Sequence, residues 1–131
     1  MSEPTEPLRV VIADDDADMR MLVGIAVRKA GLELAAVTAD GDEAWQAITE
    51  HRPDLIVLDV SMPGMSGLDV CRLVKSDPAL AGIPVLLLSA GVSGASRAAG
   101  IDAGATDFMP KPFSPRALAA KLLVLAGGQA A

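Results

Sequence analysis

The feature that most constrains the fold of this chain is an alternation of short apolar runs with segments of helical periodicity. The five short runs, which are apolar or rich in β-prone residues, are Leu8–Ala13, Leu32–Thr38, Leu55–Leu58, Val85–Leu88 and Thr106–Met109. Near-continuous apolar runs of this length are typical of strands that are covered on both faces, as in a parallel sheet. Parallel neighbours need crossover connections, and the intervening segments can supply them as helices.

The first intervening segment has the clearest helical pattern. Its core-facing residues recur at helical spacing and are Met19, Leu22, Val23, Ala26 and Val27. Gly31 follows them as a stop signal. Before them, Asp16 and Asp18 fall at the expected cap and first turn, where the helix dipole favours negative charge.

Four further helices are predicted over residues 42–51, 66–75, 92–103 and 114–126. In the second of these, Leu68, Cys71 and Leu73 are expected to lie near the core. The helix over 92–103 is weakly encoded because its glycines disfavour helix and it has almost no large apolar residue. In the last, Ser114 is expected to be the N-cap and Gly127 the stop.

This order of elements predicts an α/β protein with a doubly wound, five-stranded parallel sheet and five helices on its two faces. The 131 residues suit one domain, predicted over residues 8–126, between an N-terminal tail of residues 1–7 and a C-terminal tail of residues 127–131. In such sheets, ligands bind beyond the carboxyl ends of the strands. The residues that follow each strand are therefore the candidates for a site.

Composition narrows the function classes. The net charge is −6, from 17 acidic and 11 basic residues without a Lys/Arg cluster, which argues against nucleic acid as a direct ligand. No apolar run reaches the roughly 18–20 residues of a membrane helix, and no signal sequence begins the chain, so a cytoplasmic location is expected. The lone Cys71 excludes an internal disulfide and is interpreted as a buried, inert thiol.

Polar side chains follow four of the five predicted strands. Asp14 and Asp15 come after the first strand, Asp59 after the third, Ser89 after the fourth and Lys111 after the fifth. Three carboxylates without His or Cys make a hard oxygen site that suits Mg²⁺. A hydroxyl and an ammonium can hold phosphoryl oxygens, and a carboxylate can itself act as the nucleophile that forms an acyl phosphate.

The same residues carry a family resemblance. The pair Asp14-Asp15, Asp59 in "LDVSMPGMSG", Ser89-Ala90 and the "KPF" that begins at Lys111 occur in order at successive strand ends. Across residues 8–126 the chain resembles the receiver domain of two-component response regulators. The resemblance implies the flavodoxin-like strand order 2-1-3-4-5 and a cis bond between Lys111 and Pro112.

The resemblance also implies a role for each residue of the acidic site. Asp59 is the expected phosphoryl acceptor and a Mg²⁺ ligand. Asp15 is expected to bind Mg²⁺ directly, Asp14 to orient a metal-bound water, and Ser61 to offer its backbone carbonyl to the metal. Lys111 is expected to pair with Asp59 at rest and with the phosphoryl group afterwards.

Two residues are expected to take part in switching. Ser89 is expected to hydrogen-bond a phosphoryl oxygen and to move on activation. Phe108 occupies the position of an aromatic side chain that swings inward in many relatives, and the alternative is that it belongs simply to the core. Gly91, two residues beyond Ser89, is predicted to leave the acyl phosphate open to water and short-lived.

Two surfaces are candidates for partners. Ala17, Met21 and Ile25 form an apolar strip on the first helix, predicted to contact a sensor histidine kinase or a histidine phosphotransfer protein. The alternative is that the strip packs against the fifth helix. The face formed by the fourth helix, fifth strand and fifth helix is predicted to bind a downstream protein or, after phosphorylation, a second copy.

Other functions compete with a phosphoacceptor switch. A phosphatase that uses an aspartyl nucleophile usually has a second aspartate two residues later, where this chain has Ser61, and a cap domain for which it has no room. A receiver-shaped binding module that is never phosphorylated is the other rival, although the acidic set here is complete. The chain could also be the N-terminal part of a longer regulator with an output domain.

Overall fold

The computed structural model describes residues 7–90 and 94–130, and the predictions on Gly91 and Val92 lie outside this part of the chain. Its strands are β1 (Arg9–Ala13), β2 (Glu33–Thr38), β3 (Leu55–Asp59), β4 (Val85–Ser89) and β5 (Asp107–Pro110). Its helices are α1 (Ala17–Lys29), α2 (Gly41–His51), α3 (Gly67–Ser76), α4 (Gly94–Asp102) and α5 (Pro115–Ala130). The predicted elements are thus confirmed in kind and order.

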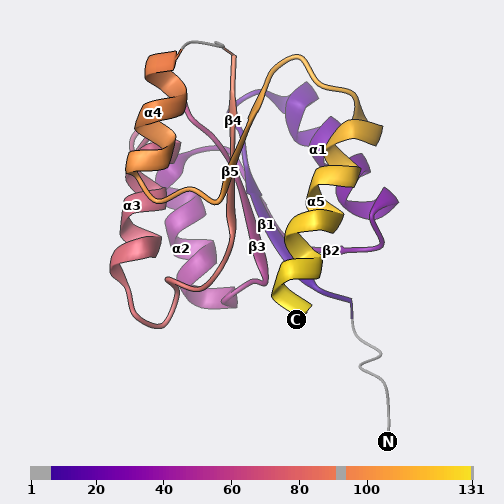
Figure 1. Cartoon of the computed structure of the whole chain (residues 1–131), viewed down its shortest axis with the longest axis horizontal. Coiled ribbons are helices and arrows are strands. Elements are labelled where there is room, and N and C mark those ends of the chain that lie inside the picture. Colours follow the sequence, from indigo (N-terminus) through magenta and orange to yellow (C-terminus); the bar gives the residue numbers. More distant parts are fainter. Residues whose placement is uncertain (1–6, 91–93, 131) are drawn as a thin grey trace, which may run out of the picture.

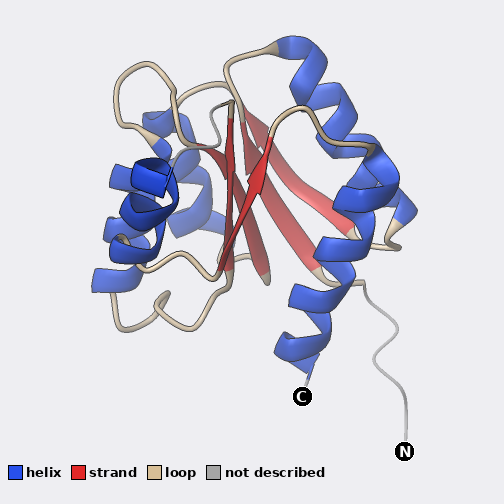
Figure 2. Cartoon of the chain, turned by 45° about the horizontal axis from the view of Figure 1, so that its top comes forward, coloured by secondary structure: helices blue, strands red, loops and turns tan. Residues whose placement is uncertain are grey.

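The five strands form one parallel sheet in the order β2-β1-β3-β4-β5, as Figures 1 and 2 show. The order reverses at β1, so the carboxyl ends of β1 and β3 lie side by side at the topological switch point. The predicted doubly wound fold and strand order are confirmed.

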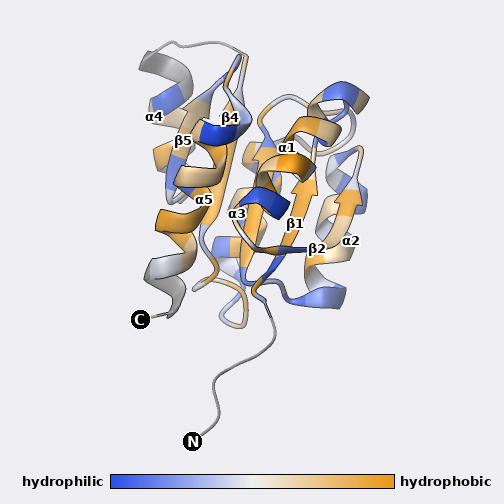
Figure 3. Cartoon of the chain, turned by 90° about the vertical axis from the view of Figure 1, so that its right-hand side faces the viewer, coloured by the Kyte–Doolittle hydropathy of each residue, from blue (hydrophilic) through white to orange (hydrophobic). Residues whose placement is uncertain are grey.

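Helices cover both faces of the sheet and create two apolar cores. On one face α1 and α5 pack on the sheet through residues such as Val23, Val27, Leu118 and Leu122. On the other face α2, α3 and α4 cover a second core. The strands between these layers are predominantly hydrophobic (Figure 3), which explains why they appear in the sequence as continuous apolar runs.

Local capping agrees with the sequence at two helices. Asp16 caps α1, with its carboxylate accepting hydrogen bonds from the backbone N–H groups of Asp18 and Met19 at 2.8 and 3.3 Å. The Ser114 hydroxyl accepts a bond from the backbone N–H of Ala117 at 3.0 Å at the start of α5. The expected cis bond between Lys111 and Pro112 is also present.

Two local predictions are wrong. The helix α5 does not stop at Gly127 but continues to Ala130, because a single glycine costs only about 1 kcal/mol in a helix that already packs on the sheet. Leu73 is exposed, whereas Cys71 is buried as predicted, together with Val70 and Val74. None of the described helices is long and apolar enough to cross a membrane.

Candidate functional site

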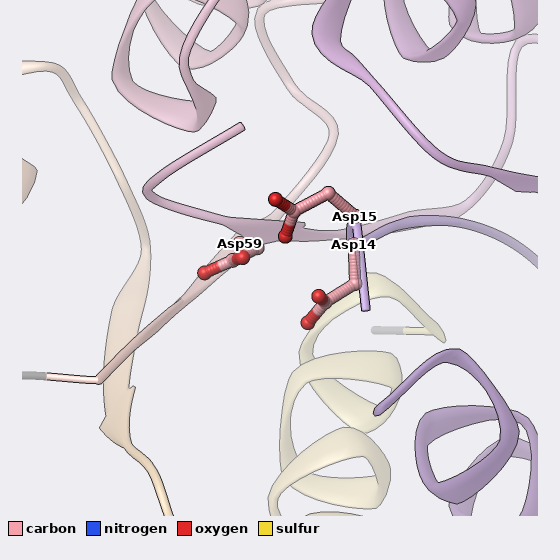
Figure 4. A group of neighbouring side chains, drawn as sticks. All are labelled: Asp14, Asp15 and Asp59. Carbon is pink, nitrogen blue, oxygen red and sulfur yellow. The ribbon is translucent and has the colours of Figure 1, made fainter. Parts of the chain in front are cut away.

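The polar residues predicted at the strand ends meet at the carboxyl edge of the sheet. Asp14 and Asp15 follow β1, and Asp59 is the last residue of the adjacent β3. One carboxylate oxygen from each of the three lies within 4.8 Å of the others, as Figure 4 shows. The sheet topology therefore brings together side chains that are 45 positions apart in the sequence.

Asp14 is the most firmly held of the three carboxylates. Its side chain is buried, with the residue only 2% exposed. One carboxylate oxygen accepts a hydrogen bond from the backbone N–H of Asp16 at 2.9 Å, and the other accepts one from Lys111 Nζ at 2.9 Å. Its backbone N–H donates to the Thr38 carbonyl at 3.1 Å, which fixes the strand end in place.

Lys111 bridges the acidic set. Its ammonium lies 2.9 Å from Asp14 Oδ2 and 3.3 Å from Asp59 Oδ1. The predicted pairing of Lys111 with Asp59 is present, and Lys111 also pairs with Asp14, which is the closer of the two carboxylates. Burial alone lowers the pKa of Lys111, but the hydrogen bond to Asp14 and the two carboxylate charges outweigh it and raise that pKa above its usual value.

Asp59 is only 5% exposed, and its charge is costly at this position. Burial is the largest cause that raises the pKa of Asp59, and the neighbouring charge of Asp14 adds to it; together they bring it to about 6 from 3.8. Lys111 and a backbone hydrogen bond from Ser61 act in the opposite direction without cancelling the rise. Lys111 therefore compensates the charge of the ionised carboxylate only in part.

An open pocket lies over these side chains. Its lining residues are Asp15, Asp16, Asp59, Val60, Ser61, Ser89, Ala90 and Lys111. Asp15 is exposed to solvent, whereas Ser89 is only 6% exposed at the end of β4. The pocket thus presents the carboxylate of Asp59 to a molecule that approaches from solvent.

The donor set fits a hard divalent cation. Three carboxylates from adjacent strand ends supply oxygen ligands only, and among the described residues a single ammonium, that of Lys111, forms ion pairs with them. Mg²⁺ prefers such oxygen ligands and commonly retains waters and phosphate oxygens in its remaining positions. The residues at this edge could therefore hold Mg²⁺.

The model of the response regulator receiver domain family matches residues 10–123 of the chain. The chain belongs to this family. It is 39% identical over 114 residues to the DNA-binding response regulator MtrA of Mycolicibacterium paratuberculosis, covering 87% of this chain and 49% of that protein. It is 40% identical over 121 residues to the response regulator MprA of a Mycobacterium species, strain KMS, covering 91% of this chain and 50% of that protein.

Solved structures agree with this assignment. The signal receiver domain of the putative response regulator NarL from Mycobacterium tuberculosis superposes with a TM-score of 0.87 at 33% identity, covering 94% of this chain and 98% of that one. The chemotaxis response regulator CheY4 of Vibrio cholerae gives 0.84 at 31% identity, covering 91% and 98%. The receiver domain described here spans about half the length of the curated relatives it matches.

The apolar strip on α1 of the receiver domain faces solvent. Met21 is 66% exposed and Ile25 37% exposed, and Ala17 at the start of the helix is exposed as well. The α1 residues that share a core with α5 are Val23, Ala26 and Val27 instead. The exposed Met21 is therefore not part of the packing between α1 and α5, which was the alternative prediction.

Phe108 lies in the core, 8% exposed, where it packs close to Gly100 of α4. The guanidinium carbon of Arg97 lies 5.9 Å from the centroid of its ring, in reach of a cation–π contact. The ring thus connects β5 to α4. The sequence did not single out Arg97, because a cation–π partner has no signature at a fixed spacing.

Sequence reasoning also missed two features beside the acidic set, the place of Asp16 in the pocket lining and the bond made by Arg20. Asp16, interpreted as structural, caps α1 as predicted but also lines the pocket. Arg20 of α1 donates from Nη1 to the backbone carbonyl of Asp14 at 2.7 Å. The sequence contains a signal for Arg20, since it is the only basic residue among the first ten residues after Ala13.

Proposed function

We propose that this receiver domain is a phosphoacceptor switch that takes a phosphoryl group on Asp59 with the help of Mg²⁺. The observation that carries the proposal is the environment of Asp59. Its buried carboxylate ends β3, lies within 4.8 Å of two other carboxylates and contacts the ammonium of Lys111 in an open pocket. A phosphorylated aspartate is a regulatory state of the domain itself, so the domain acts as a switch and not as an enzyme on an external substrate.

Each residue around Asp59 has a distinct task in this proposal. A carboxylate oxygen of Asp59 attacks the phosphorus of the donor, the acyl phosphate bond forms, and the leaving group departs with its electron pair. Lys111 and Ser89 hold oxygens of the transferred group, which carries negative charge throughout. Asp14, Asp15, Asp59 and the Ser61 carbonyl are the proposed holders of Mg²⁺, which supplies charge neutralisation when it is bound.

The experiment that tests this function uses a small phosphodonor, so that no kinase has to be identified. Purified protein is incubated with phosphoramidate with and without Mg²⁺, and the modified residue is mapped by mass spectrometry. We expect one phosphoryl group, on Asp59, formed only with Mg²⁺, and no Mg²⁺-dependent labelling in Asp15→Asn. A folded protein that stays unlabelled would favour the binding-module rival, and labelling at another residue would contradict the role of Asp59.

We further propose that Ala17, Met21 and Ile25 contact the phosphodonor protein, a sensor histidine kinase or a histidine phosphotransfer protein. The strip is apolar, exposed and on the helix that begins beside the acidic pocket. A helical partner could cover it while its histidine reaches Asp59. The proposal also places the domain in the cytoplasm, where such donors act.

Met21→Glu is expected to slow phosphoryl transfer from the cognate donor protein at least tenfold, because a charge would replace a buried apolar contact in the complex. Labelling by phosphoramidate should be unchanged, because the small donor does not touch α1. The matched control is Val124→Glu, which places the same charge on the outer surface of α5, where Val124 is 71% exposed. Equal losses with both donors in Met21→Glu would contradict the docking role.

The output of the switch is proposed to pass through α4, β5 and α5, either to a downstream protein or to a second copy of the domain. Ser89 on β4 lines the pocket, and Phe108 on the adjacent strand β5 packs close to Gly100 of α4. The MtrA relatives are DNA-binding proteins by description. A longer regulator whose separate output domain contacts DNA is therefore a candidate context, although this acidic domain is not proposed to bind nucleic acid itself.

A further inference from the structure

Arg20 is a basic side chain beside the acidic site that bonds to a backbone carbonyl and not to a carboxylate oxygen. It lies in the first turns of α1 and is half-buried. Its Nη1 donates to the backbone carbonyl of Asp14 at 2.7 Å. Helical side chains tilt toward the N-terminus of their helix, so a residue at this position can reach back to the strand end.

The bond from Arg20 closes a ring of hydrogen bonds around the strand end. The backbone N–H of Asp16 donates to Asp14 Oδ1 at 2.9 Å, and the backbone N–H of Arg20 donates to the Asp16 carbonyl at 2.9 Å. The guanidinium then returns to the Asp14 carbonyl. Together with the bond from Asp14 N–H to Thr38, this ring fixes the Asp14 backbone on both sides.

The Asp14 carbonyl belongs to the peptide group that joins Asp14 to Asp15. Its orientation fixes where the N and Cα atoms of Asp15 lie, and thus the point from which the Asp15 side chain leaves the backbone. Asp15 is exposed, and unlike Asp14 it has no hydrogen bond to Lys111 or to the Asp16 N–H that would hold its carboxylate. Its position beside Asp14 and Asp59 thus depends on the backbone that carries it (Figure 4).

From this arrangement we infer that Arg20 is a positioning residue for metal binding, which holds the Asp14–Asp15 peptide so that Asp15 faces the cation. The inference rests on the proposed function, because Mg²⁺ is the cation that the site is proposed to hold. Positioning and electrostatic repulsion by Arg20 would change the affinity for Mg²⁺ in opposite directions, so a measurement can distinguish them. A guanidinium beside a divalent cation repels it, so electrostatics alone predicts that Mg²⁺ binds more tightly when Arg20 is removed. Positioning predicts weaker binding.

The test measures Mg²⁺ affinity by isothermal titration calorimetry at constant ionic strength, far below the melting temperature of each variant. Arg20→Met is expected to weaken Mg²⁺ binding about tenfold or more, the loss typical of groups that orient metal ligands. Arg20→Lys, which keeps one donor, should recover part of the affinity. Arg28→Met removes an exposed charge from the last turn of the same helix and should change the affinity less than twofold.

The outcomes separate this inference from the function on which it rests. Arg20→Met that binds Mg²⁺ as tightly as the wild type or more tightly would overturn the positioning role while leaving the proposed function intact. A wild-type protein that takes up no Mg²⁺ would overturn both. If Arg20→Met does not fold, Arg20→Gln and Arg20→Lys take its place. If both of these variants bind Mg²⁺ as tightly as the wild type, the inference is refuted.

Discussion

Replacing Asp59 with asparagine is expected to abolish phosphoryl acceptance and, in metal-free buffer, to make the folded domain more stable. The first result follows because the amide lacks the anionic oxygen that attacks phosphorus. The second follows because the ionised carboxylate is buried beside Asp14, and the two carboxylates share the ammonium of Lys111. Removing one charge should raise the free energy of unfolding at neutral pH by about 1–3 kcal/mol.

The raised pKa of Asp59 predicts how the stability gained in Asp59→Asn depends on pH. Burial, followed by the charge of Asp14, raises the pKa of Asp59 in the folded protein from 3.8 to about 6. An acid with a raised folded pKa binds more protons when folded, so the wild type loses stability as the pH rises from about 4 to about 6. The advantage of Asp59→Asn should therefore be absent below pH 4 and complete above pH 6.

Urea unfolding at several pH values measures this difference, and phosphoramidate labelling measures the loss of function on the same samples. Asp102→Asn, which removes an exposed carboxylate at the end of α4, is the matched control and should change stability by less than about 0.5 kcal/mol. Mg²⁺ should narrow the gap, because it stabilises the wild type by binding the folded state. An Asp59→Asn protein less stable than the wild type at pH 7 would contradict the account.

The sequence predicts the fold well because the same pattern, a short apolar or β-prone run followed by a helical segment, occurs five times. The runs of β1, β3 and β4 are buried on both faces, which leaves little choice other than a parallel sheet, and chirality then decides on which face each helix lies. The site could be predicted for a related reason. Residues such as Asp59 and Ser89 directly end apolar runs, and the sheet delivers all such ends to one edge.

What could not be predicted depends on side-chain directions across elements. The spacing of Leu73 within α3 did not reveal that Val70 and Val74 face the core. Lys111 Nζ lies 2.9 Å from Asp14 Oδ2 and 3.3 Å from Asp59 Oδ1. The sequence cannot show that Lys111 contacts both carboxylates, or which of them is closer. The sequence marks Arg20 as a basic residue close to the acidic set, but it cannot reveal the bond to the Asp14 carbonyl, because a carbonyl is present at every residue.

The two glycines of the loop after β3 have different structural roles, which the sequence alone does not reveal. The segment "SMPGMSGLD" contains Gly64 and Gly67, and the sequence does not distinguish their tasks. Gly64 has a φ of 72°, which favours glycine at a turn. Gly67 begins α3 and lies directly against the backbone carbonyl of Asp59, with its own N–H bonded to the Val60 carbonyl at 2.9 Å.

Gly67→Ala is therefore expected to be the most destabilising single methyl substitution of this loop, lowering the free energy of unfolding by about 3–5 kcal/mol. The added Cβ would overlap the Asp59 carbonyl oxygen, a backbone atom that no rotamer change can move away. Relief requires α3 to shift from the end of β3, which also moves Asp59, the proposed phosphoacceptor. Phosphoramidate labelling of the folded fraction should therefore slow as well.

Gly127→Ala supplies the matched control for this substitution. A Cβ at Gly127 meets no atom within 4 Å, and the residue is exposed within α5. Alanine there should stabilise the helix by up to about 1 kcal/mol, so the same chemical change should have opposite signs at the two positions. Urea unfolding of both variants measures these two changes in the free energy of unfolding. If Gly67→Ala lost less than about 1 kcal/mol, the β3–α3 junction would have to be looser than its close backbone contact indicates, and the rigid placement of Asp59 would lose its structural basis.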